Sequence, residues 1–172
     1  MKPPPRCLFS PFALLWLSLV LLLGACSGPL AIKFGDLVLY SPNPRSLLAD
    51  PALQACLNQA LSTVENATPA TLKTLACTNS GVENLEGIKA LTQLEELELS
   101  GNRISDIAPL VNLKNLRVLN LSDNRVGNIG ILDSLPILRF VTLSGNDSLA
   151  CIQVDALQRR LGNTLVRPGQ CI

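Results

Sequence analysis

The six cysteines of this chain offer the most chemistry, because cysteines can carry lipid, form disulfides or hold a metal ion. The chain contains no histidine, the commonest general base and metal ligand, so Cys–His and Ser–His–Asp catalysis are excluded. No two cysteines form the Cys-x-x-Cys pair typical of zinc sites. We therefore predict that the protein is not an enzyme and holds neither a metal nor a cofactor. The cysteines are Cys7, Cys26, Cys56, Cys77, Cys151 and Cys171.

The charge of the chain does not favour nucleic acid as a partner. The formal net charge is +1, and it becomes −1 once the N-terminal Lys2 and Arg6 are left out. A charge this small creates no field that would attract nucleic acid or another charged surface. We expect a monomer whose partners are a membrane and another protein.

The N-terminus has the organisation of a secretion signal. Lys2 and Arg6 form a short positive region, and residues 8–23 are almost wholly apolar. This run is shorter than the roughly 20 residues that span a bilayer, and it ends in small residues, as cleaved signals do. An ordinary signal peptide, a lipoprotein signal and an uncleaved anchor can all begin in this way, so the end of the run decides between them.

The apolar run ends in Leu-Gly-Ala-Cys at residues 23–26, which resembles a bacterial lipobox. In lipoproteins the peptidase cuts before this cysteine, which by then carries a diacylglycerol. The resemblance implies that residues 1–25 are removed and that lipid on Cys26 anchors the protein to the membrane. Ser27, rather than an aspartate, follows the cysteine, which in lipoproteins of two-membrane bacteria implies transfer to the outer membrane.

Residues 26–48 are predicted to form a lipidated tether. Glycines and prolines interrupt this segment, as in linkers. The more apolar run at 32–40 could pair as a strand or lie along the folded domain, and a tether is the simpler interpretation. At about 3.3 Å per residue, an extended tether of about 20 residues reaches at most roughly 65 Å from the lipid.

The rest of the chain repeats every 22 residues, counted from leucines at positions 72, 94, 116 and 138. Apolar residues recur three, five, 13, 16 and 19 positions after each of these leucines, and asparagine recurs eight positions after three of them. A repeat of this length is typical of a solenoid. The first two apolar columns are Leu75, Leu97, Leu119 and Val141, and Cys77, Leu99, Leu121 and Leu143.

Each column has a physical interpretation. The pattern Leu-x-x-Leu-x-Leu turns alternate side chains inward on a short strand, and successive strands stack into a parallel sheet. The asparagines Asn102, Asn124 and Asn146 follow these strands, so we predict a structural ladder of buried amides that bond backbone groups of neighbouring coils. The later apolar columns are three residues apart, with Pro109 and Pro136 between them, which favours 3₁₀ or extended turns over full helices.

The sequence Leu-Glu-Glu-Leu-Glu-Leu-Ser-Gly-Asn-Arg-Ile-Ser-Asp-Ile-Ala-Pro-Leu at 94–110 resembles the 22-residue repeats of internalin-type leucine-rich-repeat proteins, as does Gly-Val-Glu-Asn-Leu-Glu-Gly-Ile at 81–88. The resemblance covers about residues 50–172. It implies a short right-handed α/β solenoid with a parallel β-sheet on one face, used for protein recognition. The first unit departs from the pattern with Ser80 in the asparagine column, and the fourth has Ser148 where a hydrophobic residue is expected.

Helical caps are predicted at both ends, because bare ends would expose the core and the strand edges. Asp50 and Pro51 are typical of a helix N-cap and first helical position, and apolar residues follow at three- and four-residue steps. After the last unit, residues 154–161 form a helical pattern that ends at Gly162. The predicted parts are a signal peptide at 1–25, a tether at 26–48, an N-terminal cap at 49–71, four repeats at 72–150 and a C-terminal cap at 151–172.

Four cysteines remain once the leader and the lipid-bearing residue are set aside, two in each cap region, and they allow three pairings. Two of these pairings would bridge opposite ends of the solenoid, whereas the Cα atoms of a disulfide lie within about 7 Å. A zinc site is the rival assignment, and the oxidising compartment implied by the leader disfavours it. The predicted disulfides, each worth roughly 3 kcal/mol in the chain-entropy picture, are therefore Cys56–Cys77 and Cys151–Cys171.

The outward side chains of the strands form the candidate binding face. We predict that the protein is a binding module whose protein partner contacts this face; the alternative is a structural component of the cell envelope with no discrete partner. Neighbouring charges also neutralise one another here, so a solvated face is the simpler interpretation of any single residue. The two outward columns are Lys73, Glu95, Arg117 and Arg139, and Ala76, Glu98, Asn120 and Thr142.

Overall fold

The computed structural model describes residues 33–34, 37–38 and 46–171; the predicted signal peptide, Cys26 and most of the predicted tether lie outside these ranges. The chain divides into two units, residues 1–41 and 42–172. In the first unit, β1 (Lys33–Phe34) pairs with β2 (Leu37–Val38) in antiparallel fashion. Part of the run at 32–40 therefore pairs as a strand, one of the arrangements that the sequence left open.

The second unit begins with helix α1 (Pro51–Thr63), for which Asp50 is the N-cap, as the sequence predicts. Proline is well placed at the start of a helix because the first N–H groups have no partner within the helix. Leu53 and Leu57 lie about one turn apart on the buried face of the helix, and neither has any exposed surface. The helix therefore closes the N-terminal end of the core.

The chain reaches α1 by crossing the first coil. Leu48, the last residue of the predicted tether, is buried, and the N–H of Ala49 donates to the carbonyl oxygen of Glu86 (3.1 Å). The crossing leaves no room for a side chain at Gly87, where φ is 93° and a Cβ would collide with the carbonyl oxygen of Leu47. The folded unit thus includes the end of the predicted tether, and the first coil requires glycine at this position.

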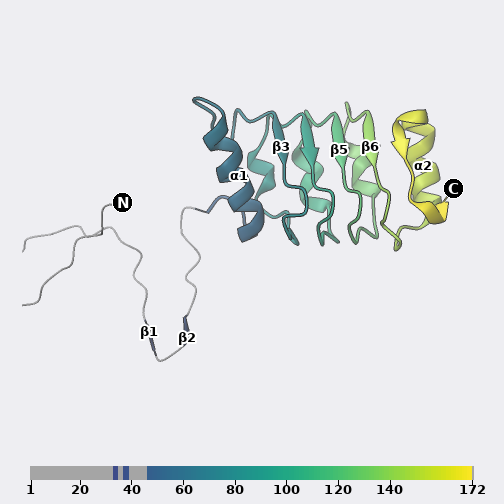
Figure 1. Ribbon diagram of the computed structural model, residues 1–172. Coiled ribbons are helices and arrows are strands. Elements are labelled where there is room, and N and C mark those ends of the chain that lie inside the picture. The colour runs from purple at the N-terminus through teal and green to yellow at the C-terminus, as the bar shows by residue number, and fades with distance from the viewer. Residues whose placement is uncertain (1–32, 35–36, 39–45, 172) are drawn as a thin grey trace, which may run out of the picture. The chain divides into compact units, whose positions relative to one another are not determined.

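Five short parallel strands form a continuous sheet in the order β3-β4-β5-β6-β7 (Figure 1). Leu97 pairs with Leu75 on one side and Leu119 on the other, so neighbouring strands are in register at the 22-residue step. Because equivalent positions of successive repeats pair across neighbouring strands, each sequence column becomes a line of side chains that crosses the sheet from strand to strand. The strands are β3 (Thr74–Ala76), β4 (Glu96–Glu98), β5 (Val118–Asn120), β6 (Phe140–Thr142) and β7 (Leu165–Val166).

The sequence predicts four strands, and the fifth is a correction. Helix α2 (Cys151–Leu161) begins three residues before the predicted helix, and the chain then returns to the sheet as β7. The partner of Val141 in β7 is Leu165, which lies 24 rather than 22 residues later, so the strand is outside the repeat that predicted the others. Leu165 is 6% exposed and helps to cover the last coil.

From β3 to β6, the chain passes between successive strands through a 3₁₀ segment rather than a full helix, as the proline and apolar spacing predicts. Each segment is three to five residues long and buries one apolar side chain completely. Short 3₁₀ segments use few residues per coil, which suits a 22-residue repeat. The segments are η1 (Ile88–Ala90), η2 (Ala108–Asn112) and η3 (Gly130–Ser134).

A single apolar core extends from α1 to α2. The leucines that begin the four units are all buried, with at most 5% of any one exposed. In the fourth unit Ser148 is exposed, and Leu149 is buried in its place. The last unit therefore preserves its core by shifting the apolar side chain one residue along the chain.

Both predicted disulfides are confirmed. Cys56 of α1 is joined to Cys77, directly after β3, with 5.8 Å between their Cα atoms. Cys151, at the start of α2, is joined to Cys171, with 5.2 Å between their Cα atoms. The first disulfide links the N-terminal cap to the first coil, and the second lies within the C-terminal cap. A disulfide at each end confirms the predicted fold of a parallel-sheet solenoid with stapled helical caps.

Candidate binding face

Each residue of the first outward column directly precedes a strand, and three of these residues form ion pairs. Lys73 Nζ lies 2.8 Å from Glu95 Oε1, and Arg117 Nη1 lies 3.9 Å from Glu95 Oε2. The hydrogen bond and charge of Lys73, together with the charge of Arg117, hold the pKa of Glu95 below its ordinary value despite some desolvation. Within residues 46–171, Arg139 makes no ion pair. Lys73, Glu95 and Arg117 are therefore linked by ion pairs, whereas Arg139 is their neighbour without being part of this network.

In the second outward column, the side chains of Glu98 and Asn120 accept hydrogen bonds from backbone N–H groups. Glu98 accepts hydrogen bonds from Asn120 Nδ2 (2.7 Å) and from the N–H of Ser100 (2.8 Å), and Asn120 Oδ1 accepts one from the N–H of Ser122 (3.0 Å). Each side chain thus fixes the turn after its own strand, so substitutions at these two positions would disturb folding as well as any contact with a partner. The remaining members are Ala76, which is exposed, and Thr142, which is half-buried.

A third outward column, at the first residue of each of the strands β3 to β6, was missed in the sequence-based prediction. Phe140 belongs to this column and is 53% exposed, and Val166 on the neighbouring strand β7 is 50% exposed. The signal that could have found it is an aromatic residue at an outward strand position, where polar residues are usual. The column consists of Thr74, Glu96, Val118 and Phe140.

Two hollows in the surface flank Phe140. One lies over β4 to β6, and the other lies between β6 and the C-terminal cap. Arg117, Arg139 and Phe140 line both hollows, so these three residues lie between them. The further lining residues are Glu95, Glu96 and Val118 in the first hollow, and Leu138, Arg160, Leu161 and Thr164 in the second.

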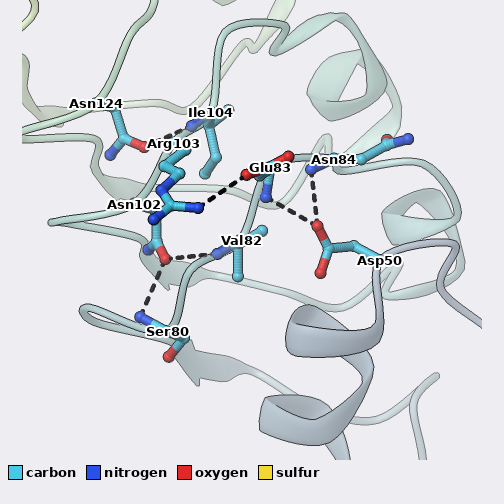
Figure 2. A network of polar contacts seen from close by, with 9 residues as sticks. All are labelled: Asp50, Ser80, Val82, Glu83, Asn84, Asn102, Arg103, Ile104 and Asn124. Carbon is cyan, nitrogen blue, oxygen red and sulfur yellow. Dashed lines mark hydrogen bonds and ion pairs between the residues drawn. The ribbon is translucent and has the colours of Figure 1, made fainter.

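The three asparagines of the predicted ladder are buried, with at most 7% of any one exposed. Figure 2 shows Asn102, whose Oδ1 accepts hydrogen bonds from the N–H groups of Ser80 (3.1 Å) and Val82 (2.9 Å) in the preceding coil. Its Nδ2 donates to one carbonyl oxygen of the preceding coil (2.7 Å) and one of its own coil (2.8 Å). Asn124 and Asn146 make the corresponding bonds one and two coils later, except that the oxygen of each accepts from a single N–H group, that of Ile104 or Val126.

Asp50 links the N-terminal cap to the first coil in a similar way. Its Oδ1 accepts hydrogen bonds from the N–H groups of Ala52 (2.8 Å) and Leu53 (3.1 Å). Its Oδ2 accepts from the N–H groups of Glu83 (2.8 Å) and Asn84 (3.0 Å), as Figure 2 shows. Burial alone would raise the pKa of this carboxyl group, but the four N–H donors together lower it. The sequence reveals the capping role, not the contact with a coil more than 30 residues away.

Two internalins of Listeria monocytogenes are similar in structure to this chain. An internalin (inlF) has a TM-score of 0.53 at 30% sequence identity, over 58% of this chain and 31% of that one. Internalin C2 (inlC2) has a TM-score of 0.55 at 30% identity, over 60% of this chain and 48% of that one. Residues 92–147 also match the family described as leucine rich repeat. The coils over these residues are leucine-rich repeats, and the solenoid is similar in structure to those of the two internalins.

The present chain spans less than half the length of either internalin, and no curated protein matches its sequence. In these leucine-rich repeats the inward columns and the asparagines build the coil, and outward side chains such as Phe140 are exposed on the strand face. In the described ranges, no three acidic, cysteine or histidine side chains gather where they could hold a metal ion. The same ranges contain no helix with the length and apolar character needed to cross a bilayer.

Proposed function

We propose that this protein is an exported lipoprotein, anchored through lipid on Cys26 to the bacterial cell envelope at the outer membrane, and that its leucine-rich repeats bind a protein partner. The lipobox-like sequence at 23–26 supports the anchor. Two disulfides in a small domain support an oxidising compartment outside the cytoplasm. The observation that carries the binding proposal is the exposure of Phe140 beside Arg139 on the strand face.

The size of the strand face limits the affinity that it can supply. Five strands about 4.8 Å apart, each exposing roughly 17 Å of chain, present roughly 400 Å². A standard protein–protein interface buries about 800 Å² on each partner. We therefore expect weak binding, or an interface that extends onto the C-terminal cap.

Replacing Cys26 by alanine is expected to abolish lipidation, because no other residue of the lipobox-like motif can carry the thioether-linked lipid, and to block the cleavage that follows it. Intact-mass measurement would show a protein that lacks the lipid mass and keeps residues 1–25. Cys7→Ala is the matched control, since this cysteine lies in the predicted leader and its loss should change neither lipidation nor cleavage. A Cys26→Ala protein that still carries the lipid mass and lacks residues 1–25 would contradict the anchor.

A photo-reactive amino acid placed at Val166 is expected to cross-link one discrete partner in whole cells. Val166 lies on the exposed strand face, and the matched control position, Val111, lies in η2 and is also exposed. Mass spectrometry of the cross-linked bands should give a partner from position 166 that is absent from position 111. Cross-links only to abundant wall components, alike from both positions, would favour the structural alternative.

A further inference from the structure

We propose that the strand face over β5 and β6 binds an extended acidic segment of a partner protein, with a carboxylate held between Arg117 and Arg139 and an apolar side chain against Phe140. This inference rests on the proposed function and adds the chemistry of the partner. Three observations carry it: the order of charges in the first outward column, the exposed apolar side chains beside the two arginines, and the position of the acidic residues elsewhere on the face.

The first outward column ends in two like charges. Its order across the sheet is Lys73, Glu95, Arg117 and Arg139. The N–H of Arg139 donates to the carbonyl oxygen of Arg117 (2.9 Å), so the two residues are direct neighbours on strands about 4.8 Å apart. Like charges directly opposite each other on neighbouring strands are destabilising.

Glu95 balances Lys73 and Arg117, but no carboxylate among residues 46–171 pairs with Arg139. A carboxylate from outside the solenoid would relieve the repulsion between the two arginines. The planar guanidinium group is well suited to this role, because it presents parallel N–H donors that match the two oxygens of a carboxylate.

Phe140 adds apolar surface beside these arginines, and Val166, which pairs with Thr142, adds more on the neighbouring strand β7. About half of each side chain is exposed, and Phe140 separates two hollows that Arg117 and Arg139 both line. Aromatic and arginine side chains are the residues most enriched at the centres of protein interfaces. The ligand that satisfies this surface therefore carries a carboxylate and an apolar side chain close together.

The charge of the face is negative at β4 and positive at β5 and β6. Three glutamates lie on or beside β4, whereas Arg117 and Arg139 stand beside β5 and β6. An acidic segment is thus attracted to β5 and β6 and repelled from β4. A sulfated or phosphorylated polymer would satisfy the two arginines but would leave Phe140 and Val166 without an apolar contact, so the surface favours a peptide.

The test measures binding of a fluorescent peptide to the full-length protein in detergent by fluorescence anisotropy. The peptide has about nine residues that alternate aspartate with leucine and phenylalanine, long enough to cross the strands. We expect the unmodified protein to bind it, and Arg139→Gln and Phe140→Ser each to weaken binding at least about fivefold. The control, Arg125→Gln, removes the same charge from an exposed position off the strands and should change affinity less than about twofold.

Two further measurements complete the test. Arg139→Gln should melt at a temperature no lower than the unmodified protein, because it removes a repulsion and no bond. Equal loss of binding in Arg139→Gln and Arg125→Gln would overturn the inference, as would equal binding of a peptide with asparagine for aspartate. Binding of dextran sulfate without binding of the peptide would also overturn it.

The cross-linking experiment at Val166 separates this inference from the function on which it rests. A discrete partner that is still cross-linked after Arg139→Gln would leave protein binding intact and overturn the acidic-segment inference. The absence of a discrete partner at every position of the strand face would overturn both. A partner whose cross-link is lost in Arg139→Gln, and retained in Arg125→Gln, is the expected result.

Discussion

Asn124→Ala is expected to lower the free energy of unfolding by roughly 3 kcal/mol. Asn124 Nδ2 donates to the carbonyl oxygens of Leu99 (2.8 Å), Leu121 (3.1 Å) and Ser122 (3.0 Å), and Oδ1 accepts from the N–H of Ile104 (3.0 Å). Alanine removes these partners together, and each buried backbone group left without one costs about 1–3 kcal/mol. Urea unfolding followed by circular dichroism would measure the loss.

Two variants sharpen this experiment. Asn112 is exposed, so Asn112→Ala should change stability by no more than about 0.5 kcal/mol. Asn124→Asp would place a carboxylate against the three carbonyl oxygens to which Nδ2 now donates, and we expect it to be less stable than Asn124→Ala. If Asn124→Ala were as stable as the unmodified protein, the asparagine ladder would not be a source of stability, and the predicted structural role of this column would be wrong.

Asp50→Asn is expected to lower the free energy of unfolding by about 2 kcal/mol at neutral pH. Both oxygens of Asp50 accept two backbone N–H groups each, one pair from α1 and the other from the first coil. An asparagine has only one such oxygen, and its NH₂ group would face two N–H donors. The variant therefore loses either the cap of the helix or the link between cap and coil.

The difference between the unmodified protein and Asp50→Asn should also depend on pH. The pKa of Asp50 in the folded protein lies below its ordinary value of 3.8, so the unfolded chain binds the proton first as the pH falls. The stabilisation from the carboxylate is therefore fully present well above pH 3.8. It declines as the pH falls below that value and is lost once the pH passes the pKa of the folded state.

The pH experiment requires urea unfolding at a series of pH values from about 7 to about 2. Asp147→Asn is the matched control, because Asp147 is exposed and its side chain accepts no hydrogen bond from residues 46–171. Its difference from the unmodified protein should stay small at every pH. A difference for Asp50→Asn that remained constant down to about pH 2 would mean that the ionised carboxylate does not stabilise the cap.

The sequence by itself determined the solenoid, its register and its disulfides. A repeat of fixed length brings the same position of every coil to the same height, so each column of leucines, such as the one that includes Leu97, had to become a line of inward side chains. The cysteines followed from this placement, because only neighbouring elements lie within disulfide reach. The periodic part of the chain is predictable because each unit constrains the next.

Only the tertiary structure decided the parts that do not repeat. Strand β7 joins the sheet outside the 22-residue register, and Asp50 meets the first coil through a contact that no local pattern records. The roles of the outward side chains were also not predictable from the sequence, which identifies Glu98 and Phe140 only as outward positions. In the structure Glu98 is hydrogen-bonded to its neighbours, whereas Phe140 is exposed. Inward positions are selected by the shared requirement for burial, but the role of an outward side chain depends on which neighbour it meets in space.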